Sequence, residues 1–139
     1  MDTNFVKAHI AINVKSVPES IDFHRKLFGM EPSKVRTGYA KFDVENPPLN
    51  FTLNENSIQS GLSHLGIQVA STADVLGVRD RWKNEGLFPQ NEMNTTRCYA
   101  VQDKSRVQDP DGNEWEVFAV LQDNLPETER SCCTSSCCK

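Results

Sequence analysis

Apolar and polar residues alternate along two separate segments of the chain, residues 9–14 and 64–69. The segments read HIAINV and HLGIQV, so histidine, an apolar residue, a small residue, isoleucine, an amide and valine follow in the same order. Each is followed by a stretch with the period of an amphipathic helix. The match predicts an internal duplication in which each copy begins with a strand that leads into a helix.

Capping and breaking residues predict where the two helices begin and end. The first helix should start near Pro18, with Ser16 as a nearby cap, and end before Gly29. The second should start after residue 71 or 72 and end before Gly86. The two helices therefore close in the same way in both copies.

Short strand-like runs follow each predicted helix: residues 39–44, 50–55, 98–103 and 115–120. The turn sequences NPP (46–48) and DPDGN (109–113) separate the runs within each copy. Proline presets one turn dihedral and glycine admits a positive one, so DPDGN is a strong turn signal. Each copy is therefore predicted to be a βαβββ module.

The two modules define the expected organisation of the chain. They cover about residues 5–56 and 60–122. Two such modules can form a curved mixed sheet around a metal-binding cleft, so we expect an α+β domain over residues 1–122. Residues 123–139 are polar and lack core residues, which predicts a flexible, Cys-rich tail.

Composition and charge narrow the possible functions. The formal net charge of −4 gives no basic surface for nucleic acid. The chain carries no signal-peptide pattern and no apolar run of membrane-spanning length, so we expect a cytoplasmic protein without a membrane partner. Cys98 stands alone, and the other four of the five cysteines lie within the last eight residues. That distribution does not suit a disulfide framework and favours reduced thiols, which bind soft metals and metalloids.

His9 and His64 occupy the same position in the two copies, so we expect them to lie close together. Strand alternation puts Glu116 on the face that should line the cleft, while Glu114 lies at the turn end of its strand. A buried carboxylate is costly unless it is paired or coordinates a cation. Two histidines and one carboxylate with open positions are typical of non-haem Fe(II) sites that use O2, with zinc as the alternative. In the alternative, non-functional interpretation, both histidines are ordinary half-buried residues and Glu116 faces solvent.

The first copy offers no counterpart of Glu116. Residues 50–54 read NFTLN and include neither a histidine nor a carboxylate. His24 shares an apolar helix face, so we expect it to be packed and not to bind a ligand. Lys104 and Arg106 are expected to be exposed, solvated cations.

The repeated modules, His9, His64 and residues 109–116 (DPDGNEWE) resemble the glyoxalase/bleomycin-resistance/extradiol-dioxygenase superfamily, also called the vicinal-oxygen-chelate superfamily. The resemblance covers about residues 5–122. It implies a metal site formed by His9, His64 and Glu116.

Three further segments resemble the cadmium-induced-protein branch of that superfamily, which includes the organoarsenical carbon–arsenic lyases. They are LNFTLNE at 49–55, SHLGIQV at 63–69 and CYAVQDK at 98–104. This resemblance implies an Fe(II)- and O2-dependent cleavage of trivalent organoarsenicals such as methylarsenite, with release of arsenite.

The chain departs from that branch at Arg97-Cys98, where the branch often has two adjacent cysteines. Trivalent arsenic is thiophilic, and two thiolates hold it more firmly than one. We therefore expect Cys98, with Cys132 or Cys133 of the tail, to bind the substrate; without a tail thiol, the protein would bind its substrate weakly. The alternative is that Cys98 is a small buried apolar residue.

Other functional classes remain alternatives. A glyoxalase-like isomerase would need a fourth metal ligand, which the first copy lacks. Neither that isomerase nor an extradiol dioxygenase has a use for the tail thiols. A metal or metalloid sequestration protein would explain the tail but not an intact metal triad. The modules could pair within one chain or swap between two copies to form a homodimer.

Overall fold

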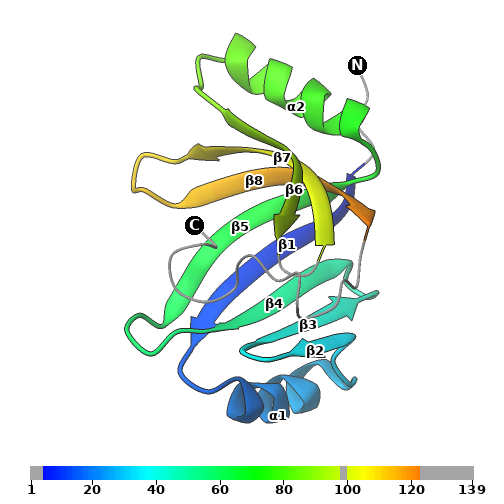
Figure 1. The fold of residues 1–139 in the computed structure, drawn as a ribbon, viewed down its shortest axis with the longest axis vertical. Coiled ribbons are helices and arrows are strands. Elements are labelled where there is room, and N and C mark those ends of the chain that lie inside the picture. Colours follow the sequence, from blue (N-terminus) through cyan, green and yellow to red (C-terminus); the bar gives the residue numbers. More distant parts are fainter. Residues whose placement is uncertain (1–4, 98–99, 123–139) are drawn as a thin grey trace.

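The computed structural model describes residues 5–97 and 100–122. Their elements are, in chain order, β1 (Phe5–Val14), α1 (Val17–Phe28), β2 (Lys34–Arg36), β3 (Tyr39–Val44), β4 (Leu49–Glu55), β5 (Gly61–Val69), α2 (Thr72–Asn84), β6 (Gln90–Arg97), β7 (Ala100–Gln108) and β8 (Glu114–Gln122). The order βαβββ occurs twice, which confirms the predicted modules (Figure 1). We call residues 5–55 the N-terminal module and residues 61–122 the C-terminal module.

All eight strands of the described residues form one curved sheet, in the order β2-β3-β4-β1-β5-β8-β7-β6. The two modules meet where β1 and β5 pair antiparallel at the centre of the sheet. Each of these strands also pairs parallel with the last strand of its own module, β1 with β4 and β5 with β8. Because parallel and antiparallel pairs coexist, the sheet is mixed, as predicted.

Local sequence signals explain the helix boundaries. Ser16 caps α1 by accepting a hydrogen bond from the backbone N–H of Glu19, and Ser71 caps α2 in the same way through Asp74. Gly29 follows α1 in the left-handed conformation, at φ 68°, which glycine adopts without steric cost. The predicted ends of both helices are therefore confirmed.

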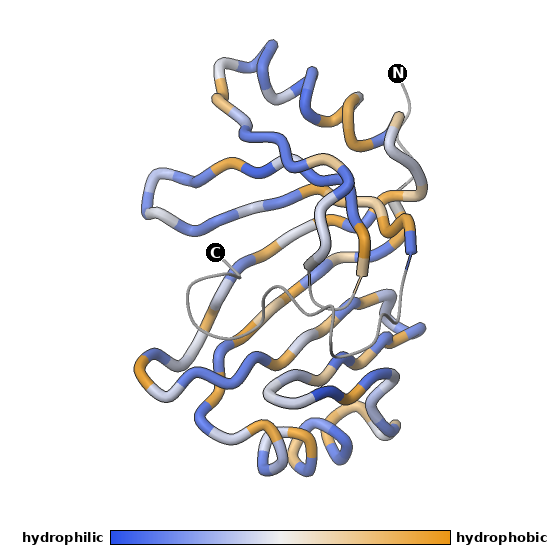
Figure 2. Tube along the Cα trace, in the orientation of Figure 1, coloured by the Kyte–Doolittle hydropathy of each residue, from blue (hydrophilic) through white to orange (hydrophobic). Residues whose placement is uncertain are grey.

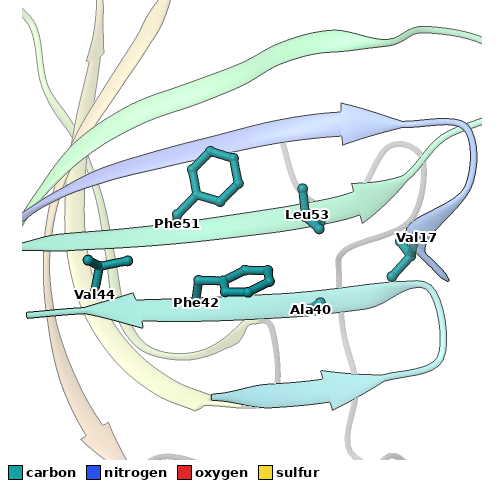
Figure 3. Close-up of a cluster of buried hydrophobic side chains, with 6 residues drawn as sticks. All are labelled: Val17, Ala40, Phe42, Val44, Phe51 and Leu53. Carbon is teal, nitrogen blue, oxygen red and sulfur yellow. The ribbon is translucent and has the colours of Figure 1, made fainter. Parts of the chain in front are cut away.

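The two helices lie far apart, α1 beside β3 and β4 and α2 beside β7 and β8 (Figure 1), and each packs with its own apolar cluster. The cluster under α1 is rich in aromatic residues and consists of Val17, Ala40, Phe42, Val44, Phe51 and Leu53 (Figure 3). The cluster under α2 consists of Val69, Val75, Val78, Val117 and Ala119. Polar and apolar positions alternate along strands such as β4 (Figure 2), so the face of β4 opposite α1 carries the polar side chains of Asn50, Thr52 and Asn54.

Two strands went undetected in the sequence, and several strand boundaries differ: β1 begins at Phe5 and β5 at Gly61, earlier than the predicted runs. The sequence pattern did not locate β2 or β6, because neither alternates clearly between apolar and polar residues. β7 continues to Gln108, five residues beyond the predicted run, because its polar residues pair with β8 as far as Glu114. No helix among the described residues has the length and apolar character needed to cross a membrane. The predicted tail lies outside the described residues.

Candidate active site

The structure brings together the three side chains that the sequence selected as metal ligands. His9 comes from β1, His64 from β5 and Glu116 from β8, three neighbouring strands at the centre of the sheet. Gly66 on β5 pairs with His9 on one side and with Glu116 on the other, which sets their positions. The three side chains lie on the face opposite the two helices, and each residue is less than a tenth exposed.

The donor atoms of these residues converge. His64 Nε2 lies 3.2 Å from His9 Nε2 and 3.1 Å from Glu116 Oε2. Two atoms that each bind one metal ion at about 2.1 Å are separated by roughly 3.0–3.3 Å when the angle at the metal is about 90–105°. These two spacings are compatible with neighbouring ligands on a single ion, and equally with hydrogen bonds between the side chains.

Hydrogen bonds fix which nitrogen of His9 faces the other two side chains. His9 Nδ1 lies 3.0 Å from the backbone oxygen of Asn50, which can only accept, so Nδ1 carries the hydrogen. A neutral His9 then presents the lone pair of Nε2, the form in which histidine binds a metal. His64 Nδ1 lies 3.1 Å from Ser63 Oγ, which can accept a hydrogen in the same way.

Glu116 also forms a buried ion pair with Lys104, whose Nζ lies 2.9 Å from Oε1. Burial by itself would raise the pKa of Glu116, but Lys104 and the two histidines outweigh it and lower the pKa to about 2. The carboxylate is therefore ionised throughout the neutral range. The expectation that Lys104 is solvated was wrong, because a side chain on the cleft face of β7 reaches Glu116 on β8.

Burial also keeps His9 neutral. It lowers the pKa of His9 to about 4, and the nearby His64 and Lys104 act in the same direction against the opposing effect of Glu116. A neutral histidine and an ionised carboxylate are the protonation states that a metal requires of its ligands.

The donor atoms suit a metal ion, but the side chains are not arranged as a complete metal site. No group of three His, Cys, Asp or Glu side chains within residues 5–97 and 100–122 is already spaced as a finished metal site. Here Lys104 shares the carboxylate, and His64 Nε2 lies within hydrogen-bond distance of both His9 Nε2 and Glu116 Oε2. Metal binding at His64 Nε2 requires the tautomer whose hydrogen is on Nδ1, where Ser63 Oγ can accept it.

The register of the sheet also identifies the counterpart of Glu116 in the N-terminal module. Gly66 pairs with Glu116, and the matching residue of the first copy, Ala11, pairs with Thr52. Thr52 is therefore the fourth corner of the pseudo-symmetric site, and it is buried and uncharged. The sequence alone limited this counterpart to five residues, because only strand pairing selects among them.

Other candidate residues have structural roles or lie outside the described residues. Glu114 pairs with Arg106, Nη1 to Oε2 at 2.9 Å, so Arg106 is not the solvated cation that was expected. His24 is packed, as predicted, with its ring centroid 4.8 Å from that of Phe51. The predicted substrate thiols Cys98, Cys132 and Cys133 lie outside the described residues.

Several known proteins are similar to this chain in sequence. Residues 8–117 match the Glyoxalase/Bleomycin resistance protein/Dioxygenase superfamily model. The trivalent organoarsenical cleaving enzyme of Bacillus sp. (strain MD1) is 43% identical, with 94% of this chain and 98% of that protein covered. The cadmium-induced protein CadI of Mycobacterium bovis is 40% identical, with 85% of this chain and 78% of that protein covered.

A solved structure agrees in fold. The Mn(II)-bound glyoxalase from Novosphingobium aromaticivorans has a TM-score of 0.65 at 17% identity, over 91% of this chain and 43% of that one. The sequence relatives, the family match over most of the chain and the doubled βαβββ sheet agree with one another. The chain belongs to the glyoxalase/bleomycin resistance protein/dioxygenase superfamily, in the group that includes trivalent organoarsenical cleaving enzymes and CadI.

Proposed function

We propose that this chain is a non-haem Fe(II) enzyme that uses O2 to cleave the carbon–arsenic bond of trivalent organoarsenicals, such as methylarsenite, and releases arsenite. The observation that carries the proposal is the convergence of His9, His64 and Glu116 in a buried cluster. A relative named as a trivalent organoarsenical cleaving enzyme, 43% identical over nearly its full length, supports the choice of substrate.

The donor set favours Fe(II). Two imidazoles and one carboxylate leave coordination positions for a substrate and O2, as in other iron enzymes with this ligand set. When bound, the iron supplies the one-electron chemistry through which O2 reacts with a substrate. Thr52 adds no charge at the fourth corner, which keeps that side of the site open.

The protein's own residues have distinct tasks in this proposal. His9 and His64 bind the metal as neutral imidazoles, and the hydrogen bond from His9 to the backbone of Asn50 orients the first ring. Lys104 holds Glu116 through Oε1, which leaves Oε2 directed toward His64. Lys104 is thus a positioning residue for the carboxylate.

Thiols are proposed to hold the arsenic. Cys98 would bind the trivalent arsenic, and Cys132 or Cys133 would supply the second thiolate that Arg97 cannot provide. Binding at thiols beside the metal would bring the carbon–arsenic bond and O2 together, and such positioning supplies much of the rate gain in two-reactant chemistry.

The reaction balances with O2 as the only co-reactant. Methylarsenite, CH3As(OH)2, and O2 contain together the atoms of arsenite, As(OH)3, and formaldehyde. The carbon–arsenic bond breaks, arsenic stays trivalent, the methyl carbon is oxidised and O2 is reduced. One oxidised carbon product per arsenite is therefore expected.

The test is anaerobic reconstitution with Fe(II), addition of methylarsenite, and then admission of O2 to half of the sample. Arsenite and formaldehyde should form only in the half that receives O2, and only with protein that retains iron. Stoichiometric binding without turnover in both halves would contradict the proposal and support metalloid sequestration. Turnover with Zn(II) and without O2 would overturn the choice of metal.

A further inference from the structure

The outward side of α1 carries two large apolar residues. Phe23 is 60% exposed and Leu27 is 61% exposed, although α1 already packs its other side with the cluster that contains Val17. The two residues are four positions apart, so their side chains are neighbours on one face of the helix. α1 itself lies at one end of the molecule, away from α2 (Figure 1). An adjacent apolar pair on an outer helix face marks a candidate contact surface.

The equivalent helix of the C-terminal module shows that the fold does not require these residues. α2 runs over Thr72–Asn84 and exposes no large apolar side chain. Its exposed residues are small, polar or charged: Ala73, Asp80, Arg81, Lys83 and Asn84. Each helix packs with its own cluster through the opposite side, so core packing does not explain Phe23 and Leu27.

The charged residues of α1 are ordered along the helix. Glu19 and Asp22 precede Arg25 and Lys26, so the first half is acidic and the second half is basic. An antiparallel helix of the same sequence brings basic residues level with acidic ones, and it also opposes the two helix dipoles. A parallel copy would bring like charges level. The pattern is therefore complementary to itself in one orientation, which is the property of a two-fold interface.

The spacing of these residues defines the register of such a pair. With the two-fold axis at residue 24, Asp22 of one copy lies level with Lys26 of the other, since each is two positions from the axis. Phe23 of one copy then lies level with a point between Phe23 and Leu27 of the other, so the apolar side chains interdigitate. One register thus brings together both the opposite charges and the apolar residues.

We propose that the outward face of α1, formed by Asp22, Phe23, Lys26 and Leu27, is the contact surface between two copies of this chain. The two helices pack antiparallel about a two-fold axis at residue 24. No exchange of modules is needed, because β1 and β5 pair within one chain. The proposed metal ligands lie on the other face of the sheet, so the interface does not cover them and is independent of the proposed function.

The interface is small, so the dimer should dissociate at moderate protein concentrations. One pair of short helices buries less than the roughly 1,600 Å² of a standard protein interface. Sedimentation velocity of the full chain, from about 10 µM to about 1 mM, covers the dissociation constants expected for such a contact. A reducing agent is present throughout, so that the five cysteines do not cross-link copies. A wild-type protein that stays monomeric across this range would overturn the proposal.

Making α1 resemble α2 tests the apolar part of the surface. Phe23→Asp/Leu27→Asn introduces residue types that α2 exposes, and both positions are exposed, so Tm should change little. Association should become at least about tenfold weaker, because the central apolar contacts are lost. Phe88→Asp is the matched control, since Phe88 is 90% exposed, lies in the other module and gives the same change in charge. Wild-type association in the double variant, or an equal loss with Phe88→Asp, contradicts the proposal.

An exchange of charges tests the antiparallel register. Asp22→Lys alone and Lys26→Asp alone each place like charges level across the two-fold axis, so each variant should associate about five- to tenfold more weakly than the wild type. An equimolar mixture of the two variants restores both opposite-charge pairs in a heterodimer, which should form with nearly the wild-type affinity. Weak association of the mixture, or wild-type association of either variant alone, overturns the antiparallel packing.

Discussion

The two modules share one topology but differ in what they place on each face of the sheet. Between α1 and the sheet the N-terminal module packs aromatic rings, among them Phe28 of α1 and Phe42 of β3, whose centroids are 5.5 Å apart. Under α2 the C-terminal module packs small aliphatic side chains such as Val75 and Val117. Both clusters bury the apolar face of an amphipathic helix, so either composition supports the same fold.

The cleft faces differ more. The N-terminal module contributes His9 and a row of neutral residues on β4, whereas the C-terminal module contributes His64, Glu116 and Lys104. Equivalent positions in the two modules therefore carry an uncharged threonine and an ionised carboxylate. The duplication determines where side chains can meet, and the differences between the copies determine what they can bind.

Replacing Glu116, the proposed carboxylate ligand, should have the largest effect on metal binding and turnover. Glu116→Gln removes the single negative charge among the three proposed ligands, so Fe(II) binding and turnover should fall by roughly 10³-fold or more. Metal content and arsenite release measure the two effects. Glu114→Gln is the matched control, since Glu114 pairs with Arg106 and should leave iron content unchanged.

Glu116→Gln also leaves Lys104 buried without its partner, which can destabilise a protein by about 3–5 kcal/mol. The double variant Glu116→Gln/Lys104→Met removes both charges and should restore Tm without restoring iron. Recovery of iron in this double variant would contradict the assignment of Glu116 as a ligand.

Making the modules more alike should have the next largest effect. Thr52→Glu places a carboxylate at the position that corresponds to Glu116. A fourth ligand would strengthen metal retention but occupy a position that substrate or O2 needs, so turnover should fall about 10- to 100-fold. Thr52→Gln, similar in size and uncharged, is the control. Higher turnover in Thr52→Glu would refute the idea that the open corner serves the reaction.

The sequence predicted the modules and the triad well because both depend on local patterns. The repeat of His9 and His64 and the alternation around Glu116 selected three side chains that lie together in the structure. His64 is within hydrogen-bond distance of both His9 and Glu116. Metal binding by these residues stays a prediction.

The sequence could not predict contacts that depend on pairing between strands. Lys104 reaches Glu116 because β7 and β8 are adjacent, and Asn50 reaches Gln68 across β1. Neither contact leaves a signal at a fixed spacing along the chain. The short β2 was missed because three residues contain too little alternation to detect.

Gly66 and Ala11 provide a smaller test of the same comparison. A Cβ on Gly66 would lie 2.8 Å from the backbone oxygen of Glu116 and 3.4 Å from His9 Cδ2, whereas the equivalent Ala11 is accommodated. Gly66→Ala should therefore displace β8 or the His9 ring, costing about 1–3 kcal/mol of stability and weakening metal binding. Chemical denaturation and metal titration measure both. Ala11→Gly, the reverse change, should lower stability slightly without a specific loss of metal.

The smallest expected effect concerns acid stability of the metal-free protein. The pKa of His9 in the folded state is lowered to about 4, below its ordinary value of 6.5, so the unfolded state binds a proton more readily. Stability linked to His9 is fully present above pH 6.5 and is lost as the pH falls toward 4. From pH 7 to pH 5.5 this loss should be roughly 1 kcal/mol. The ordinary pKa of Glu116 is 4.5, so the stability linked to Glu116 is lost only at lower pH.

Urea denaturation at pH 7 and pH 5.5, in wild type and in His9→Gln, isolates the contribution of His9 to the free energy of unfolding, because glutamine does not titrate. A pH-dependent loss of the same size in both proteins would show that His9 is not held neutral by its buried position.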